Sequence, residues 1–563
     1  MRADAGTTGT LERSIDDDDD HDDTGRPRRV VRRRTVLSGI AGSVALAGCA
    51  ELDGIFPTPG TDPGTDPPGP APSAPPAAGG GAGQPVEPVL ADDEVLHLLR
   101  RTTFGPSAEL VAGVREDGVA AYLDEQLAPE DIDDGACEQL LGRYPALELS
   151  ASEINQREED AGGRFRADRD MVQATVLRAV CSRRQLLEVM AEFWANHFNV
   201  FTPSDDDWGR RTVSDREVYR VHALGRFADL LLASAKDPAM LRYLNNEQSC
   251  STGDPNTVQE NYGRELLELH TLGVGNYTET DVKNSAYILT GWRVDDARQF
   301  RFDAGCHYTG EVRVLDFTHA NDSQEDGLEV GEAYLDHLAH HELTATFVCT
   351  KLARRFVADE PSQDLVATLA QTFLEEDTAI VPVLRALFDS DEFRASVGQK
   401  TRRPLEDIIA TARALGLEVL ETPRSDNPRT LLDVAYDLGQ APMNWAPPNG
   451  YPDTANVWLS SARLLGSWNY HWDLIEGRYD DWLSPAVDAV AQLADGAGDT
   501  VGEVVDAVTE RLVWQQLRDE DRAAVIEFTG GAEGDPAGDG DALIDLVKRV
   551  ALAILNSPYH LQR

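Results

Sequence analysis

The residues best suited to chemistry in this chain are three histidines, which lie in separate stretches with helical spacing. His197 follows Trp194 by one helical turn, so the two rings share a face, while Asn196 points elsewhere. His222 begins a second amphipathic stretch, and His270 lies near the centre of the apolar face of a third. A histidine among apolar residues either has a buried hydrogen-bond partner or takes part in a reaction.

The polar residues of the third stretch fall on the opposite side of the same expected helix. At about 100° per residue, one narrow arc carries Asn261, Arg264, Glu265 and Glu268. If the histidines converge there, Glu265 or Glu268 could act beside them in general base catalysis, and the histidines could bind a metal ion. Arg264 could equally form intrahelical salt bridges with Glu260 and Glu268. The sequence therefore predicts a candidate catalytic or binding site, but it identifies neither a reaction nor a metal.

Capping signals place two helices in this region. Thr257 with Glu260, and Thr278 with Asp281, have the spacing of capping boxes, in which a hydroxyl and a carboxylate satisfy unpaired backbone amides. Gly273 stands where a left-handed residue would end the first helix. The chain contains no Gly-x-Ser-x-Gly elbow, phosphate loop or dinucleotide fingerprint. Neither a serine nucleophile nor a nucleotide is therefore indicated.

The charge of the chain argues against nucleic acid as a partner. Among 563 residues there are 51 basic and 98 acidic ones, for a net charge of −47. Residues 1–48 contribute 8 basic and 9 acidic residues, so the remaining chain carries −46. Such a surface repels phosphate backbones. Only five residues are lysine, which suits a protein exposed to high salt but also fits a coding bias towards arginine.

The N-terminal segment has the pattern of an export signal with a lipid anchor. Arg33 and Arg34 precede a short apolar run that ends in Leu46-Ala47-Gly48-Cys49. The run is too short to span a bilayer, which needs about 20 residues. Paired arginines match a twin-arginine signal, and the final four residues match a lipoprotein box. We therefore expect residues 1–48 to be removed and Cys49 to be lipidated, which would anchor the protein to the cell membrane on its extracytoplasmic side.

A tether and a helical body are expected to follow. Residues 49–90 are rich in proline and glycine, so they predict a disordered spacer that could reach roughly 100 Å. Residues 91–563 show helical periodicity with almost no alternation, which predicts an all-α body with a minor β element near Val312–Phe317. The clearest helical patterns lie at 171–200, 222–235, 332–357, 364–393, 403–415, 429–438 and 501–563.

The cysteines of the body have no tight spacing. They are Cys137, Cys181, Cys250, Cys306 and Cys349, an odd number once the lipid-bearing cysteine is set aside. This pattern does not predict a disulfide framework, but it allows a single bridge such as Cys250–Cys306.

Several blocks of the body together resemble the bacterial family called domain of unknown function 1800. The blocks are Arg100–Pro106, Phe193–Phe198, His222–Gly225, Asp237–Leu244, Glu260–Gly275, Lys351–Pro361, Arg403–Pro404 and Pro447–Pro452. The resemblance covers about residues 92–563. It implies a large, mostly helical, exported protein without an established activity. Members of that family are often encoded near proteins resembling the sulfatase/alkaline-phosphatase superfamily, so such an enzyme is a candidate partner.

Two functions fit these observations. The first is a lipid-anchored surface module for binding or assembly. The alternative is an extracytoplasmic, hydrolase-like enzyme, with or without a metal, whose site would lie around His197, Arg264, Glu265 and His270. The geometry of these four side chains distinguishes the two, because a shared site requires them to converge.

Overall fold

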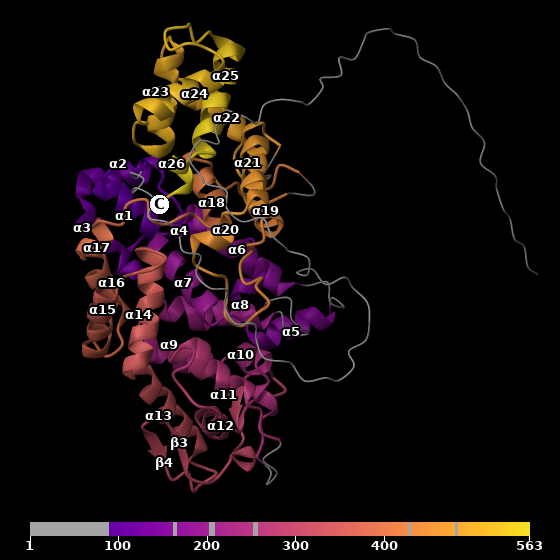
Figure 1. Cartoon of the computed structure of the whole chain (residues 1–563). Coiled ribbons are helices and arrows are strands. Elements are labelled where there is room, and N and C mark those ends of the chain that lie inside the picture. Colours follow the sequence, from indigo (N-terminus) through magenta and orange to yellow (C-terminus); the bar gives the residue numbers. More distant parts are fainter. Residues whose placement is uncertain (1–88, 161–165, 202–208, 252–256, 426–428, 479–481) are drawn as a thin grey trace, which may run out of the picture. The chain divides into compact units, whose positions relative to one another are not determined.

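The computed structural model describes residues 89–160, 166–201, 209–251, 257–425, 429–478 and 482–563 (Figure 1). The expected export signal, Cys49 and nearly all of the tether lie outside these ranges. The described part contains 26 α-helices and four short strands, which confirms the all-α class with a minor β element. One hydrophobic core extends from Leu96 to Tyr559 and therefore includes residues from both ends of the body.

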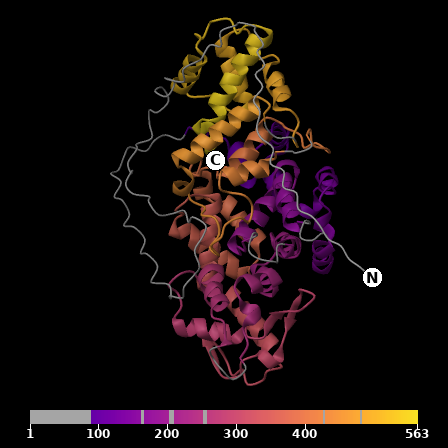
Figure 2. The same cartoon turned by 90° about the vertical axis from the view of Figure 1, so that its right-hand side faces the viewer.

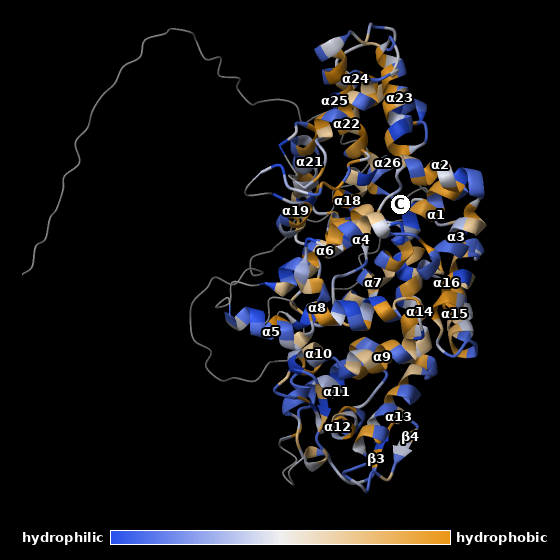
Figure 3. Cartoon of the chain, turned by 180° about the vertical axis from the view of Figure 1, so that it is seen from behind, coloured by the Kyte–Doolittle hydropathy of each residue, from blue (hydrophilic) through white to orange (hydrophobic). Residues whose placement is uncertain are grey.

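The first helices pack against α6 (Ala167–Cys181) and α7 (Gln185–His197). These two helices correspond to the expected helical pattern at 171–200, which the chain divides near Arg184. Around them lie α1 (Glu94–Thr102), α2 (Ala108–Asp117), α3 (Val119–Gln126) and α4 (Gly135–Leu141). A further helix, α5 (Ala151–Asp160), is hydrophilic over most of its length (Figure 3). It packs through Ile154 into a small separate apolar cluster.

The next segment contains two π-helical turns, η4 (Asp215–Arg220) and η7 (Leu266–Thr271). η4 continues α8 (Arg210–Ser214), and η7 continues α11 (Asn261–Glu265). Between and after them lie α9 (Phe227–Lys236), α10 (Pro238–Tyr243) and α12 (Glu279–Ile288). Neither π turn could be expected from a pattern analysed at 3.6 residues per turn.

One of the two expected capping boxes forms. Thr278 and Asp281 cap α12 reciprocally, as predicted. The prediction for Thr257 and Glu260 is wrong, because the first helix begins only at Asn261 and the Thr257 hydroxyl donates to the Cys250 carbonyl instead. Gly273 has φ +84°, which confirms the expected left-handed residue after the helix.

Two antiparallel hairpins make up the β structure. The expected element near Val312–Phe317 is confirmed as β3 (Val312–Val314) paired with β4 (Phe317–His319). These strands lie beside α12 and α13 (Gly327–Ala339) (Figure 1). The second hairpin joins β1 (Trp292–Val294) to β2 (Phe300–Phe302). This second hairpin was not predicted from the sequence.

The remaining helices form two packed groups. In the first, α14 (Glu342–Phe356) packs on α15 (Gln363–Glu375), which packs on α16 (Ile380–Phe388), followed by α17 (Asp391–Arg394). In the second, α18 (Pro404–Ala414) contacts both α6 and α21 (Ser461–Ile475). The last helices pack around α25 (Gly540–Leu555), as two views show (Figures 1 and 2). They are α22 (Ala486–Ala494), α23 (Val501–Val513), α24 (Asp519–Thr529) and α26 (Pro558–Leu561); the short α19 (Leu431–Asp437) and α20 (Ala455–Trp458) precede α21.

A buried carboxylate joins these groups. Glu406 of α18 is 2% exposed and contacts the guanidinium of Arg355 of α14. Its Oε1 lies 3.0 Å from Arg403 and 3.2 Å from Arg563. Glu192 of α7 pairs in turn with Arg403 at 2.8 Å. We call these five residues the Glu406 cluster. It links segments that are hundreds of residues apart in the chain.

Two disulfides cross-link the body. Cys250 pairs with Cys306, the bridge that the sequence allowed, and Cys137 pairs with Cys181. The expectation that the cysteines form no framework therefore has to be corrected, since sequence separations of 44 and 56 residues gave no sign of either pairing. Cys349 is free and buried. Within the described ranges, the helices all lack the combination of length and apolarity that crossing a membrane requires.

Replacing Glu406 with glutamine should lower the free energy of unfolding by about 3–5 kcal/mol, because it leaves buried arginines without a counter-charge. Burial alone would raise the pKa of Glu406, but Arg355, Arg403 and Arg563 hold it well below its usual value. The stabilisation is therefore present above the pKa of the unfolded carboxyl, about 4.3. It is lost as the pH falls towards the folded value. Urea unfolding at several pH values measures both effects.

The matched control is Asp124→Asn, which removes the pair between the exposed side chains of Asp124 and Arg385. This change should cost at most about 1 kcal/mol. Equal losses for the two variants would contradict the role given to the Glu406 cluster.

Candidate functional site

Helix α7 carries candidate residues on two faces. Trp194 and His197 point into the core, and both are at most 1% exposed. The Trp194 indole donates to the Ala223 carbonyl at 2.9 Å, which ties α7 to the segment before α9. Asn196 lies on the other face, as its position in the helix predicts, and contacts Tyr451. The core face and the Tyr451 face are therefore separate environments.

On the core face, His197 joins two residues from distant helices. Its Nε2 lies 3.1 Å from the carbonyl oxygen of His270, and its Nδ1 lies 2.8 Å from Nζ of Lys351 on α14. A carbonyl can only accept, so Nε2 carries the proton and Nδ1 accepts from the lysine. The His197 and His270 rings are 6.2 Å apart between centroids. Two of the predicted histidines thus lie together, with a lysine as the third member.

All three groups have lowered pKa values. Burial lowers the pKa of His270 to about 3, with a further contribution from Lys351. Burial, Lys351 and His270 together place the pKa of His197 well below its usual value. Burial and the nearby Arg354 lower the pKa of Lys351 to about 7. At neutral pH both imidazoles are therefore uncharged, and the Lys351 amine loses its proton more readily than an ordinary lysine, which suits a base or a nucleophile.

The His270 ring is unusual within this group. Both of its nitrogens are buried and lack a hydrogen-bond partner among the described residues, and the ring packs 5.0 Å from Phe198 and 6.3 Å from Tyr262 between centroids. His270 lies in the π-helical turn η7, a type of distortion often found at functional sites. An unpaired buried imidazole costs stability, so this position is not explained by packing alone.

The polar residues predicted on the same helix do not join the two histidines. Arg264 forms a two-pronged pair with Glu279 of α12 at 2.9 and 2.7 Å. The alternative of an intrahelical ladder with Glu260 and Glu268 is therefore wrong for this residue. Glu268 instead accepts from the Tyr277 hydroxyl.

Three more predicted residues lie apart from the histidine pair. Burial and the neighbouring Glu268 raise the pKa of the half-buried Glu265. Asn261 is exposed and donates to the Leu244 carbonyl at 3.3 Å. His222 is half-buried, and burial lowers its pKa. The arrangement that could do chemistry is therefore His197, His270 and Lys351.

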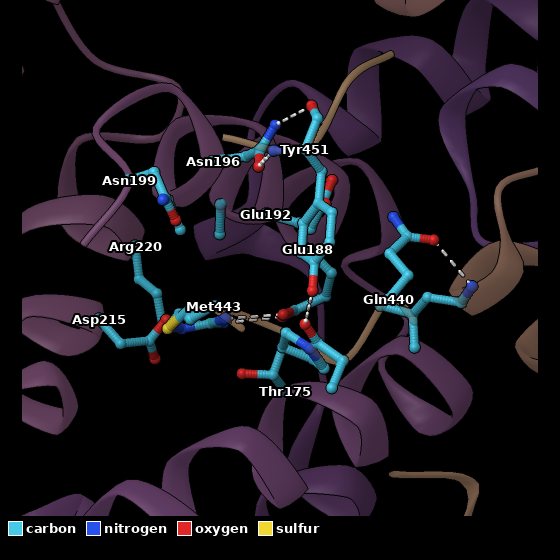
Figure 4. Close-up of a pocket in the computed structure, with 15 residues that line it drawn as sticks. Thr175, Glu188, Glu192, Asn196, Asn199, Asp215, Arg220, Gln440, Met443 and Tyr451 are labelled. Atoms are coloured by element: carbon cyan, nitrogen blue, oxygen red, sulfur yellow. Dashed lines mark hydrogen bonds and ion pairs between the residues drawn. The ribbon is translucent and has the colours of Figure 1, made fainter. Parts of the chain in front are cut away.

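A pocket lies on the opposite face of α7 (Figure 4). Its wall includes Glu188 and Asn199 of the α7 segment, Arg220 of η4, and Met443 and Tyr451 of the loop after α19. Figure 4 shows Arg220 reaching towards Glu188 across the pocket floor. The two side chains form a pair of hydrogen bonds at 2.6 and 2.7 Å. Polar residues thus line this pocket, but its charges are already paired.

Hydrogen bonds at this pocket hold the loop after α19 against α7. The Asn196 amide donates to the Tyr451 carbonyl at 2.9 Å and accepts from the Tyr451 amide at 2.7 Å. Asn199 donates to two carbonyls of the loop at 2.8 Å each. Gly450 has φ +72°, and a Cβ there would lie 2.2 Å from the Asn196 carbonyl oxygen. These contacts serve the fold, and they leave few polar groups for a ligand.

Lys351 was not predicted as a site residue. Only five lysines occur among 51 basic residues, so a lysine within an amphipathic helix was a usable signal. Its contact with His197, 154 positions away, could not be inferred from spacing. Among the described residues, the group with metal-ligand geometry is Asp407, His471 and His560, and none of these was predicted.

Most of the chain matches one protein-family model. Residues 97–561 match the family model described as protein of unknown function (DUF1800). The chain belongs to the DUF1800 family. No curated protein and no solved structure matches it. For this DUF1800 member, the pairing of His197 with Lys351 and the position of His270 come from the structure of the chain itself.

In this DUF1800 protein the Lys351 amine should titrate near pH 7. With [13C]ε-lysine labelling, the five lysines give few enough signals for assignment by NMR, and Lys351→Met identifies the relevant one. The expected result is a midpoint at about 7, because burial disfavours the charged amine. A midpoint near the usual lysine value of about 10.4 would contradict the geometry described for His197 and Lys351.

Proposed function

We propose that this protein is a lipid-anchored, extracytoplasmic module that binds a partner protein through one face of α21. Anchoring rests on Arg33, Arg34 and Cys49, which carry the twin-arginine pattern and the lipoprotein box. The two disulfides of the body support this location, because such bonds persist in oxidising compartments and are rare in the cytosol.

The observation that carries the binding role is an exposed apolar surface. We call it the tryptophan face, and it consists of Val457, Leu459, Leu465, Trp468 and Trp472. Each of these side chains is 39–50% exposed. The last three follow the i, i+3, i+7 spacing that places residues on one side of a helix. Large apolar side chains exposed on one side of a helix are typical of interaction sites, and tryptophan is enriched among the residues that dominate binding energy.

The other side of α21 is well anchored. Arg463, Ser467 and His471 are buried beneath the tryptophan face and contact Asp407 of α18. A helix fixed in this way presents its outer side chains without a large ordering cost on binding. The face is therefore suited to docking a folded partner.

Charge favours one kind of partner. The chain after residue 48 carries −46, so a second copy would be repelled at low salt, as would nucleic acid. We therefore assign the tryptophan face to a protein whose apolar patch is bordered by lysine or arginine. An enzyme resembling the sulfatase/alkaline-phosphatase superfamily is the first candidate to examine.

A second function, extracytoplasmic catalysis, is favoured by one observation. Lys351 combines a pKa of about 7 with a direct contact to His197, as expected for a base or nucleophile. Arg264 and Glu265, which the sequence also placed at this site, do not contribute to the arrangement. If the Lys351 amine titrated in the usual lysine range, this second function would lose its basis.

Replacing Cys49 with serine should abolish labelling by fatty acid and release the protein from membranes, because no thiol remains for lipid attachment. Lipid labelling and membrane fractionation measure these effects. The matched control is Cys349→Ala, which removes a buried free thiol of the body and should leave both readouts unchanged. Membrane retention of Cys49→Ser, or a wild-type protein that keeps Met1, would show that the anchor is assigned wrongly.

A photoreactive amino acid at position 465 should cross-link one partner protein on intact membranes. Once that partner is purified, the double change Trp468→Ala/Trp472→Ala should weaken binding by about 30-fold or more, corresponding to about 2 kcal/mol. Added salt should also weaken binding, because the charges are complementary.

The matched control for this experiment is Phe528→Ala. Phe528 is 43% exposed on α24, outside the tryptophan face, so its removal should leave the affinity unchanged. Equal affinity of wild type and double variant, or cross-linking only to lipid, glycan or a second copy, would refute the assignment.

A further inference from the structure

Three ligand-type side chains from three helices meet in the core beneath α21. They are Asp407 of α18, His471 of α21 and His560 of α26, and each is at most 2% exposed. Asp407 Oδ1 lies 3.8 Å from His471 Nε2 and 3.4 Å from His560 Nε2. One ligand atom from each residue falls within 4.8 Å of the others. This group is separate from the histidines of α7 and η7.

One atom of this group lacks a close hydrogen-bond partner among the described residues. Asp407 Oδ2 accepts from the Ser467 hydroxyl and lies 3.4 Å from Nη2 of Arg463. Asp407 Oδ1, in contrast, is buried and has no hydrogen-bond partner in the part of the chain that the structure describes. A buried carboxylate oxygen without a donor is costly. The carboxylate thus uses one oxygen within the protein and points the other at the two imidazoles.

The surroundings orient His471 towards the same point. Its Nδ1 lies 2.7 Å from the Asn556 side-chain oxygen, so Nδ1 carries the proton and Nε2 offers a lone pair. Histidines that bind metals usually donate their other N–H in this way. Thr411, one helical turn after Asp407, donates its hydroxyl to the Asp407 carbonyl at 2.9 Å, and its Oγ1 lies 3.0 Å from both Nε2 atoms. Two imidazole nitrogens and a carboxylate oxygen are therefore gathered in one small buried region.

We propose that Asp407, His471 and His560 bind a structural Zn²⁺. Zinc bonds of about 2.0–2.2 Å in a tetrahedron imply ligand-to-ligand distances of about 3.3–3.6 Å. The observed 3.4 and 3.8 Å are close to this range. Nitrogen and oxygen ligands without thiolate suit Zn²⁺, whereas Mg²⁺ and Ca²⁺ prefer oxygen alone.

The ion would have a structural role. All three ligands are at most 2% exposed, which suits an ion that supports the fold rather than one that meets a substrate. The ligands come from α18, α21 and α26, so the ion would hold the helix of the tryptophan face against the centre of the body. This inference is independent of the proposed function, because it concerns only the buried side of α21.

Metal analysis of the full exported protein, purified without added metal and dialysed against Zn²⁺, tests the proposal. The expected result is one zinc per chain. Asp407→Asn, His471→Gln and His560→Gln should each lose it, while His340→Gln should retain it. His340 is the matched control, because it is a partly exposed histidine that pairs with Asp377. Zinc retained by all three site variants, or iron in its place, would overturn the proposal.

A second measurement keeps the test valid if the variants fail to fold. A chelator that removes zinc from the wild-type protein should lower Tm, and Zn²⁺ should restore it. Replacement with Co²⁺ should produce the visible absorption bands of a tetrahedral site. A wild-type protein that binds neither ion, with a Tm unaffected by the chelator, would exclude the site.

Discussion

The burial of charge around α18 is the constraint on which the rest of the body depends. Glu406 gathers three arginines from different parts of the chain, and it is as deeply buried as its partners. Removing such charges from water costs several kcal/mol per ion, which is recovered only when every partner is in place. Arg355 of α14 and Arg563 must therefore be present together. This requirement couples α7, α14 and α18 to residue Arg563 in one cooperative structure.

The next residue of α18 extends the same principle towards the surface. Asp407 contacts Arg463 and Ser467 on the inner side of α21, so the helix has a polar, directional attachment as well as apolar packing. Because these contacts fix the rotation of α21, Trp468 and Trp472 remain on the outside. The orientation of the proposed binding surface is thus a consequence of the buried charges, and it would be held in place before any partner arrives.

Much of the fold follows from local pattern, whereas little of the candidate site does. Helical periodicity predicted most helices of the body, and the Thr278 capping box and the hairpin at Val312 were found where expected. The π turn that carries His270 was not predicted, because one extra residue in a turn leaves the apolar pattern nearly unchanged. The contact of His197 with Lys351 depends on which helices pack together, and so do the cysteine pairings. Hydrophobic periodicity carries no information about which helices pack together.

The central claim is that α21 is fixed to the α18 region as part of one cooperative body. Native-state hydrogen exchange followed by mass spectrometry tests it most directly, because it reports the opening free energy of each helix. The account predicts that peptides from α7, α14, α18 and α21 exchange in a single slow class with one opening free energy. If α21 exchanged in a separate, faster class, it would be only loosely attached, and the account of the tryptophan face would be contradicted.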